Sequence, residues 1–131
     1  MDRKTILAVD DDAGVLELVS TSLRSTGHRV LTAASGSGAL ARLAGGDVDL
    51  LVLDVMMPGM SGIEVARRVR LLAGADPRIL VLSALGSHED VERALAEGAD
   101  DYLVKPFAVR ELLQRAVSLL SRPPGAEPVA G

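Results

Sequence analysis

Short apolar runs alternate along the chain with longer stretches in which apolar residues recur every three or four positions. The short runs have the length and residue types of β-strands and cover Ile6–Val9, Val30–Ala33, Asp49–Leu53, Arg78–Leu82 and Tyr102–Val104. The stretches between and after them have helical periodicity, clearest in the last, where one face carries Val109, Leu112, Leu113, Ala116, Val117 and Leu120. The pattern therefore predicts five strands and five helices in strict alternation.

Strict alternation of strands and helices is typical of a parallel sheet covered by helices on both faces. The first, third and fourth strands are almost wholly apolar, as strands buried on both faces are. Glycines follow four of the predicted helices at positions that would end them: Gly27, Gly45–Gly46, Gly74 and Gly98. We therefore predict an α/β fold with a doubly wound, five-stranded parallel sheet.

The periodic pattern stops near Arg122. The last segment, RPPGAEPVAG, is rich in Pro and Gly and has no apolar repeat. We predict one domain over residues 1–121, followed at 122–131 by a tail or by the start of a linker to a further domain.

Composition narrows the possible functions. The 131 residues are 48% hydrophobic and 24% charged, and the net charge of −4 argues against direct nucleic-acid binding. The lack of Cys excludes disulfides, thiolate metal sites and cysteine nucleophiles. With neither a signal peptide nor an apolar run long enough to span a membrane, a cytoplasmic location is expected. The one dense basic cluster, Arg67, Arg68 and Arg70, lacks aromatic neighbours and is expected to be a solvated helix face.

Four of the five predicted strands are followed by a chemically capable side chain. These are the run Asp10–Asp12 after the first strand, Asp54 after the third, Ser83 after the fourth and Lys105 after the fifth. Taken singly, each has an ordinary structural explanation as a turn, a helix cap or a surface residue. Since the carboxyl ends of parallel strands meet at one edge of the sheet, however, all four are expected to converge there.

Magnesium-assisted phosphorylation of a carboxylate fits this set of groups. Mg²⁺ takes oxygen ligands, usually one or two carboxylates, and would offset the repulsion between Asp10, Asp11 and Asp54. The Asp54 carboxylate could attack phosphorus in line and form an aspartyl phosphate. Lys105 would neutralise one phosphoryl oxygen, and the Ser83 hydroxyl would donate a hydrogen bond to another.

Four segments together resemble the receiver domain of bacterial two-component response regulators. They are ILAVDDD, LLVLDVMMPGMSG, LSA and GADDYLVKPF, and the similarity runs from about Lys4 to Leu120. The resemblance implies a flavodoxin-like fold with strand order 2-1-3-4-5. With RELLQR on the next helix, GADDYLVKPF is most similar to receivers of the winged-helix transcription-factor subfamily.

The resemblance also implies a role for each matching residue. Asp54 corresponds to the phosphoacceptor, with a sensor histidine kinase as donor. Asp10 and Asp11 correspond to the acidic pair that binds Mg²⁺, with Asp11 as the more direct ligand, and the backbone carbonyl of Met56 to a further ligand. Asp12 lies outside this pair and is expected to cap the following helix.

The switch residues of the family also have counterparts here. Ser83 matches the switch hydroxyl and Tyr102 the switch aromatic, which turns inward when the hydroxyl moves toward the phosphoryl group. Lys105 matches the family lysine, and its bond to Pro106 resembles one that is cis in the family. Pro58 and Gly62 match the loop after the acceptor, with the spacing Asp-x-x-x-Pro-x-x-x-Gly. A domain of this kind is a switch, and supports only its own phosphorylation and dephosphorylation.

The resemblance implies partners as well. Kinase docking would use mainly the first helix, around Val15–Arg24. Dimerisation on phosphorylation would use the face made by the fourth helix, the fifth strand and the fifth helix, with charges that include Asp100, Asp101, Glu111 and Arg115. The alternative for these charges is a solvated surface, and the pair Val91–Glu92 departs from the basic–apolar pair usual in the subfamily.

Apolar Met56 and Leu85 beside the acceptor predict slow loss of the phosphoryl group.

Other functions are consistent with parts of the pattern. Asp10-x-Asp12 resembles the start of a haloacid-dehalogenase-type phosphatase, in which Asp10 would be the nucleophile, although Gly14 stands where Thr or Val is expected. A receiver fold that acts only by binding is a second alternative. The output is also open: control of transcription within a longer regulator, or protein contact and phosphorelay by a stand-alone receiver.

Overall fold

The computed structural model describes residues 3–72, 76–84 and 88–121. Within these ranges the strands are β1 (Thr5–Val9), β2 (Arg29–Ala33), β3 (Leu50–Asp54), β4 (Arg78–Ala84) and β5 (Asp101–Lys105). The helices are α1 (Ala13–Arg24), α2 (Gly36–Leu43), α3 (Gly62–Val69), α4 (His88–Ala96) and α5 (Val109–Ser121). All strand pairs are parallel and the order is β2-β1-β3-β4-β5, which confirms the predicted doubly wound fold and strand order.

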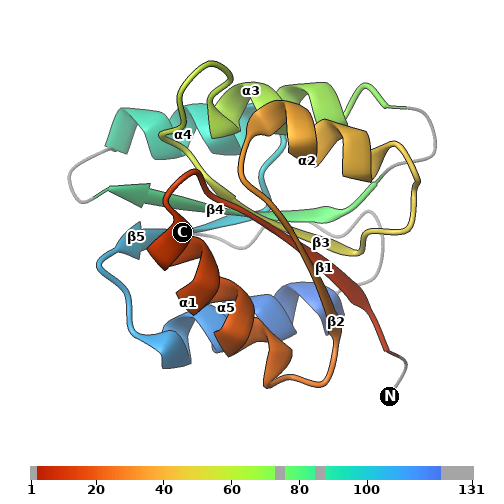
Figure 1. Cartoon of the computed structure of the whole chain (residues 1–131). Helices are drawn as coiled ribbons and strands as arrows, with labels where there is room; N and C mark the ends of the chain where they lie inside the picture. Colours follow the sequence, from red (N-terminus) through yellow and green to blue (C-terminus); the bar gives the residue numbers. More distant parts are fainter. Residues whose placement is uncertain (1–2, 73–75, 85–87, 122–131) are drawn as a thin grey trace.

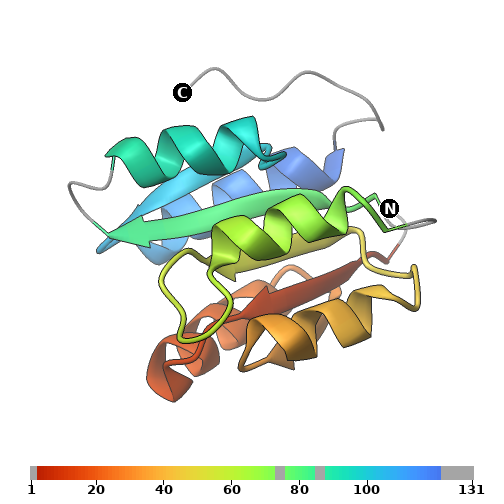
Figure 2. The same ribbon diagram turned by 90° about the horizontal axis from the view of Figure 1, so that it is seen from above.

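The sheet separates two layers of helices. Helices α2, α3 and α4 cover one face and α1 and α5 cover the other (Figure 1), and α2, α3 and α4 lie side by side when the molecule is seen from above (Figure 2). Each face has its own core, because successive strand residues point to opposite sides. In β3, Leu51 and Leu53 pack under α2 and α3, whereas Leu50 and Val52 pack against α1 and α5.

The central strands are buried on both faces, as their apolar runs predicted. All residues of β3 are buried, as are all but the first residue of β1. The edge strand β2 has no fully buried residue. The carboxylates at the ends of β1 and β3 therefore follow strands that are buried in the core of the sheet.

The strand boundaries differ from the prediction at both ends of the strands, and this changes which polar residues belong to a strand. Asp49 precedes β3 rather than beginning it, and its carboxylate accepts a hydrogen bond from the Thr5 N–H at 2.8 Å. At the other end, Asp54, Ser83 and Lys105 are paired strand residues rather than loop residues after the strands. Strand pairing thus fixes their backbones.

Two helix-end predictions are confirmed. Asp12 is the N-cap of α1, with Oδ1 accepting from the N–H groups of Gly14 at 2.9 Å and Val15 at 3.1 Å. Gly98 follows α4 with a φ of +120°, a conformation open to glycine. Gly74, Leu85 and the segment 122–131 lie outside the described residues. Among the helices within the described ranges, none has the length and apolar character to cross a membrane.

Candidate functional site

Three carboxylates meet at the carboxyl edge of the sheet. Asp10 follows β1, Asp11 comes next in the chain, and Asp54 is the last residue of β3. One oxygen from each lies within 4.8 Å of the others. Asp10 is 3% exposed and Asp54 6%, whereas Asp11 faces solvent. The three carboxylates of Asp10, Asp11 and Asp54 therefore lie together, as the sequence predicted.

One ammonium group bridges the two buried carboxylates. Lys105 Nζ donates to Asp54 Oδ1 at 3.1 Å and to Asp10 Oδ2 at 3.3 Å. Its position follows from the pairing of β5 with β4, which sets Lys105 opposite Ala84. The repulsion between the two carboxylates is thereby offset by a cation from the same fold.

The charges of this group are tuned by burial and by one another. Burial raises the pKa of the Asp54 carboxyl, and the Asp10 charge adds to the rise, while the hydrogen bonds from Lys105 and from the Met56 backbone oppose it. Partial burial lowers the pKa of Lys105, but its hydrogen bond and attraction to Asp54, together with Asp10, raise it more. Asp54 is therefore less acidic than a free aspartate, and Lys105 stays protonated.

The donor set fits a divalent cation. Carboxylate oxygens are the ligands that Mg²⁺ prefers, and the exposed Asp11 leaves one side of the cluster open to water or substrate. Asp10 Oδ1 accepts a hydrogen bond from the Asp12 N–H at 2.9 Å, which fixes the orientation of that carboxylate. Asp10, Asp11 and Asp54 could together hold a metal ion.

The loop after Asp54 returns closely to the end of β3. The Gly62 N–H donates to the Val55 carbonyl at 2.9 Å, and a Cβ at position 62 would overlap the Asp54 carbonyl oxygen. Only glycine fits this approach. Pro58 is exposed in the same loop, as is Met56, which is 67% exposed beside the acceptor carboxylate.

Ser83 and Tyr102 lie on the face of the sheet that α3 and α4 cover. Ser83 alternates with Ile79 and Val81 along β4, and both of these belong to that core, as does the half-buried Tyr102. The Ser83 hydroxyl is buried, and its Oγ has no hydrogen-bond partner among the described residues. A buried hydroxyl without a partner is costly, and the Ser83 hydroxyl is available to a group that the fold itself does not supply.

An apolar groove adjoins the site. It has a volume of about 390 Å³ and is lined by Val15, Leu18, Ala84, Lys105, Pro106 and Phe107. The Lys105–Pro106 peptide bond is cis. Leu18 of α1 is 51% exposed at this groove, so α1 presents an apolar side chain next to the ammonium that binds Asp54.

Three surface expectations are wrong. Arg70, expected on a solvated helix face with Arg67 and Arg68, instead binds residues of two other segments. Asp100 and Asp101, expected as surface charges, are 6% and 2% exposed and are paired within the chain. Their partners come from distant elements, so the local sequence gave no sign of their burial.

Arg115 of α5 is the partner of Asp101. Its NH1 donates to Asp101 Oδ1 and to the Tyr102 carbonyl, both at 2.8 Å. Glu111 is also engaged within the chain, because its Oε1 accepts from the Ala108 N–H at 3.3 Å. The Arg115 hydrogen bonds tie α5 to β5, whereas the Glu111 bond lies at the first turn of α5.

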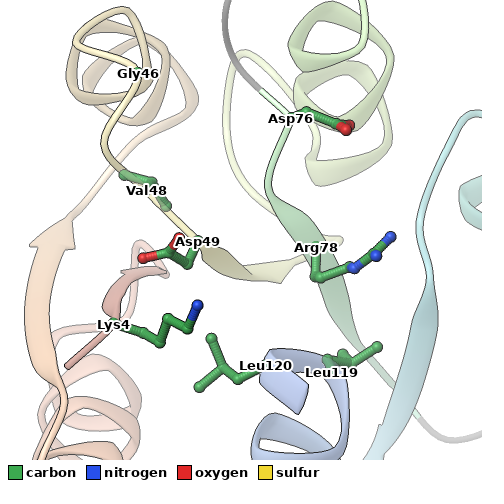
Figure 3. A pocket seen from close by; sticks show the side chains of 8 residues that line it. All are labelled: Lys4, Gly46, Val48, Asp49, Asp76, Arg78, Leu119 and Leu120. Atoms are coloured by element: carbon green, nitrogen blue, oxygen red, sulfur yellow. The ribbon is translucent and has the colours of Figure 1, made fainter. Parts of the chain in front are cut away.

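A polar cavity that the sequence did not indicate lies at the opposite edge of the sheet (Figure 3). It has a volume of about 240 Å³ and is lined by Lys4, Gly46, Val48, Asp49, Asp76, Arg78, Leu119 and Leu120. Lys4 precedes β1 whereas Asp10 follows it, so the cavity and the carboxylate cluster lie at opposite ends of the strands. The cavity is therefore separate from the predicted site.

Comparisons with known proteins agree with this architecture. Residues 6–117 match the family of response regulator receiver domains. The chain is 50% identical over 117 residues to the response regulator MprA of Mycobacterium leprae, covering 89% of this chain and 51% of the relative. It is 42% identical over 123 residues to the phosphate regulon transcriptional regulatory protein PhoB of Pseudomonas aeruginosa, and the match covers 93% of this chain and 54% of the relative.

A solved structure gives the same result for the fold. A putative response regulator from Chloroflexus aurantiacus superposes with a TM-score of 0.86 at 38% identity, covering 92% of this chain and all of that one. The expected similarity to regulators of transcription is also confirmed. The chain spans about half the length of the curated relatives it matches.

Proposed function

The chain belongs to the response regulator receiver domain family, and we propose that it switches state when Asp54 accepts a phosphoryl group from a sensor histidine kinase. The observation that carries the proposal is the Asp54 carboxylate itself. It ends a fully buried strand, lies within 4.8 Å of the Asp10 and Asp11 carboxylates, and holds the Lys105 ammonium at 3.1 Å.

The transfer forms a bond between an Asp54 oxygen and phosphorus. The bond from phosphorus to the kinase histidine nitrogen breaks, and the nitrogen keeps the electron pair. Lys105 balances the charge on Asp54 before transfer and on a phosphoryl oxygen after it. Mg²⁺ held by Asp10, Asp11, Asp54 and the Met56 carbonyl would supply charge neutralisation on the phosphoryl oxygens.

The unpartnered Ser83 hydroxyl supports a switch that follows this transfer. A phosphoryl group on Asp54 adds up to two negative charges and three acceptor oxygens, and Ser83 Oγ has no competing partner among the described residues. Movement of Ser83 toward the phosphoryl group opens space on the same face of the sheet, which the half-buried Tyr102 fills by turning inward. The face formed by α4, β5 and α5 then changes its surface.

The groove beside Lys105 supports docking of the kinase on α1. An apolar groove lined by Val15, Leu18 and Phe107 suits an apolar helix of the kinase that carries the phosphohistidine.

A cytoplasmic location and homodimerisation through α4, β5 and α5 belong to the same proposal. In a longer regulator, with 122–131 as the start of a linker, the output would be transcription.

Intact-mass spectrometry with a small-molecule phosphodonor such as acetyl phosphate tests the proposal. The wild type should gain the mass of one phosphoryl group with Mg²⁺ and not with chelator. Asp54→Asn should gain nothing, while Asp47→Asn, which removes an exposed carboxylate far from the cluster, should behave as the wild type. Labelling that survives in Asp54→Asn would favour Asp10 as nucleophile, and no labelling of the wild type would favour a domain that acts only by binding.

A further inference from the structure

The side chain of Arg70 joins three segments of the chain at the amino ends of β4 and β5. It follows α3, and its Nε and NH2 donate to the Gly98 carbonyl at 3.1 and 2.6 Å. NH2 also donates to Asp100 Oδ2 at 3.0 Å, and NH1 donates to Asp76 Oδ1 at 3.1 Å and to the Pro77 carbonyl at 2.8 Å. All five N–H groups of the guanidinium are therefore used.

The turn between α4 and β5 is shaped around this side chain. Gly98 has a φ of +120°, and a Cβ there would collide with the Arg70 stem. Asp100 is 6% exposed, and its Oδ2 also accepts from the buried Ile79 N–H at 2.8 Å. Asp100 further lies 3.9 Å from Arg78, so its charge is compensated on two sides. The turn is fixed by buried, charge-assisted contacts that are expensive to break.

Helix α4 is attached much less firmly. Ala94 is its one buried residue, so few apolar contacts hold it to the sheet. An element with few buried contacts opens at low free energy, while the segment held by a saturated guanidinium does not. The boundary between the two is Gly98, two residues after the end of the helix.

We propose that Arg70 is a positioning residue that anchors the turn Gly98–Asp100, so that rearrangement of α4 on phosphorylation ends at Gly98. The inference rests on the proposed function, because it concerns what limits the change that follows phosphorylation of Asp54. In β5, Tyr102 lies two residues beyond Asp100. The anchor thus gives the switch aromatic a fixed backbone from which its side chain turns.

Hydrogen–deuterium exchange, measured with and without acetyl phosphate and Mg²⁺, tests whether Arg70 anchors the turn. Intact-mass spectrometry of the same samples shows how much of the protein is phosphorylated. In the wild type, amides of α4 should change on phosphorylation while those of Ala99 and Asp100 should not. In Arg70→Lys, which keeps the charge but not the five donors, exchange at Ala99 and Asp100 should rise about ten-fold or more and become dependent on phosphorylation.

The matched control is Arg68→Lys. Arg68 lies two residues before Arg70, near the end of α3, but its ion pair is with Glu64 of the same helix, and its side chain is about half exposed. Exchange in this control should equal that of the wild type. A second variant, Arg70→Met, removes the charge as well and should show the larger effect.

These exchange measurements separate a role of Arg70 in the switch from a purely structural role. An equal rise in both phosphorylation states of Arg70→Lys would make Arg70 only structural and overturn the proposal, as would exchange identical to Arg68→Lys. A phosphorylation-dependent change at Ala99 and Asp100 of the wild type would overturn it too. A wild type that takes up no phosphoryl group would overturn the proposed function, and with it the role of Arg70 in the switch.

Discussion

Replacement of Lys105 by Met removes the one cation that both buried carboxylates contact within the described residues. Asp10 and Asp54 are 3% and 6% exposed, so neither can recover its lost partner fully through water. Met preserves the length of the apolar stem and contributes no charge. Without bound metal, the Lys105→Met protein should therefore have a lower free energy of unfolding than the wild type.

The size of the effect follows from the distances. At an effective dielectric constant near 20, charges separated by 3.1 and 3.3 Å attract by about 5 kcal/mol each. The carboxylates, within 4.8 Å of each other, repel by about 3.5 kcal/mol or more, and this repulsion is present in both the wild type and Lys105→Met. Desolvation of the ammonium offsets several kcal/mol of the attraction, and the Lys105 side chain is still 28% exposed. We expect a net loss in unfolding free energy of roughly 3 kcal/mol.

The loss should also depend on pH, with a definite sign. Burial raises the pKa of the Asp54 carboxyl above its unfolded value of 3.8, so its charge destabilises the fold at neutral pH and ceases to do so as pH falls through the raised pKa. Removing Lys105 raises this pKa further. The difference between Lys105→Met and the wild type should therefore shrink as the pH is lowered.

Urea unfolding followed by far-UV circular dichroism in the presence of chelator measures this, since the chain has no Trp for fluorescence. The control is Lys4→Met, the other lysine of the chain, whose ammonium makes no ion pair in the part that the structure describes. A Lys105→Met protein within about 1 kcal/mol of the wild type at neutral pH would refute the electrostatic reasoning.

Three further predictions concern other parts of the same edge and helix. Gly62→Ala should destabilise the fold by about 2 kcal/mol and slow phosphorylation, because its Cβ meets the Asp54 carbonyl, as calorimetry and intact mass would report. Hydrogen bonds from Arg67 and, more weakly, from Arg68 should lower the pKa of the Glu64 carboxyl to about 2, as an NMR titration would measure. An ordinary pKa would show that these ion pairs do not form in solution. Replacing apolar Met56 by Asn should shorten the life of the phosphorylated form, measured by its decay in intact mass.

The site could be predicted because its residues lie at, or directly after, the carboxyl ends of strands. The apolar runs locate the strands, parallel pairing brings their carboxyl ends to one edge, and Asp54 and Lys105 therefore had to meet. The cap at Asp12 followed from local sequence alone. What the apolar pattern misjudged was the final strand residue, since it ends where the last apolar side chain does, while backbone pairing continues through Asp54.

The contacts of Arg70 could not be predicted in the same way. Its partners Gly98 and Asp100 are 28 and 30 residues away, and no periodicity relates an arginine after one helix to a turn after the next. Charged residues are rarely buried, so Asp100 and Asp101 were expected at the surface. Their burial depends on cations from other elements, which only the folded chain brings near.

The position of the phosphoryl group in the chain tests directly whether Asp54 is the phosphoacceptor. After treatment with acetyl phosphate and Mg²⁺, borohydride reduction converts a phosphorylated aspartate to homoserine, which tandem mass spectrometry can place in the sequence. If Asp54 is the phosphoacceptor, homoserine should appear at Asp54 alone. Homoserine at Asp10, Asp11 or Asp12, or its absence from every aspartate of a chain that gained phosphoryl mass, would contradict it.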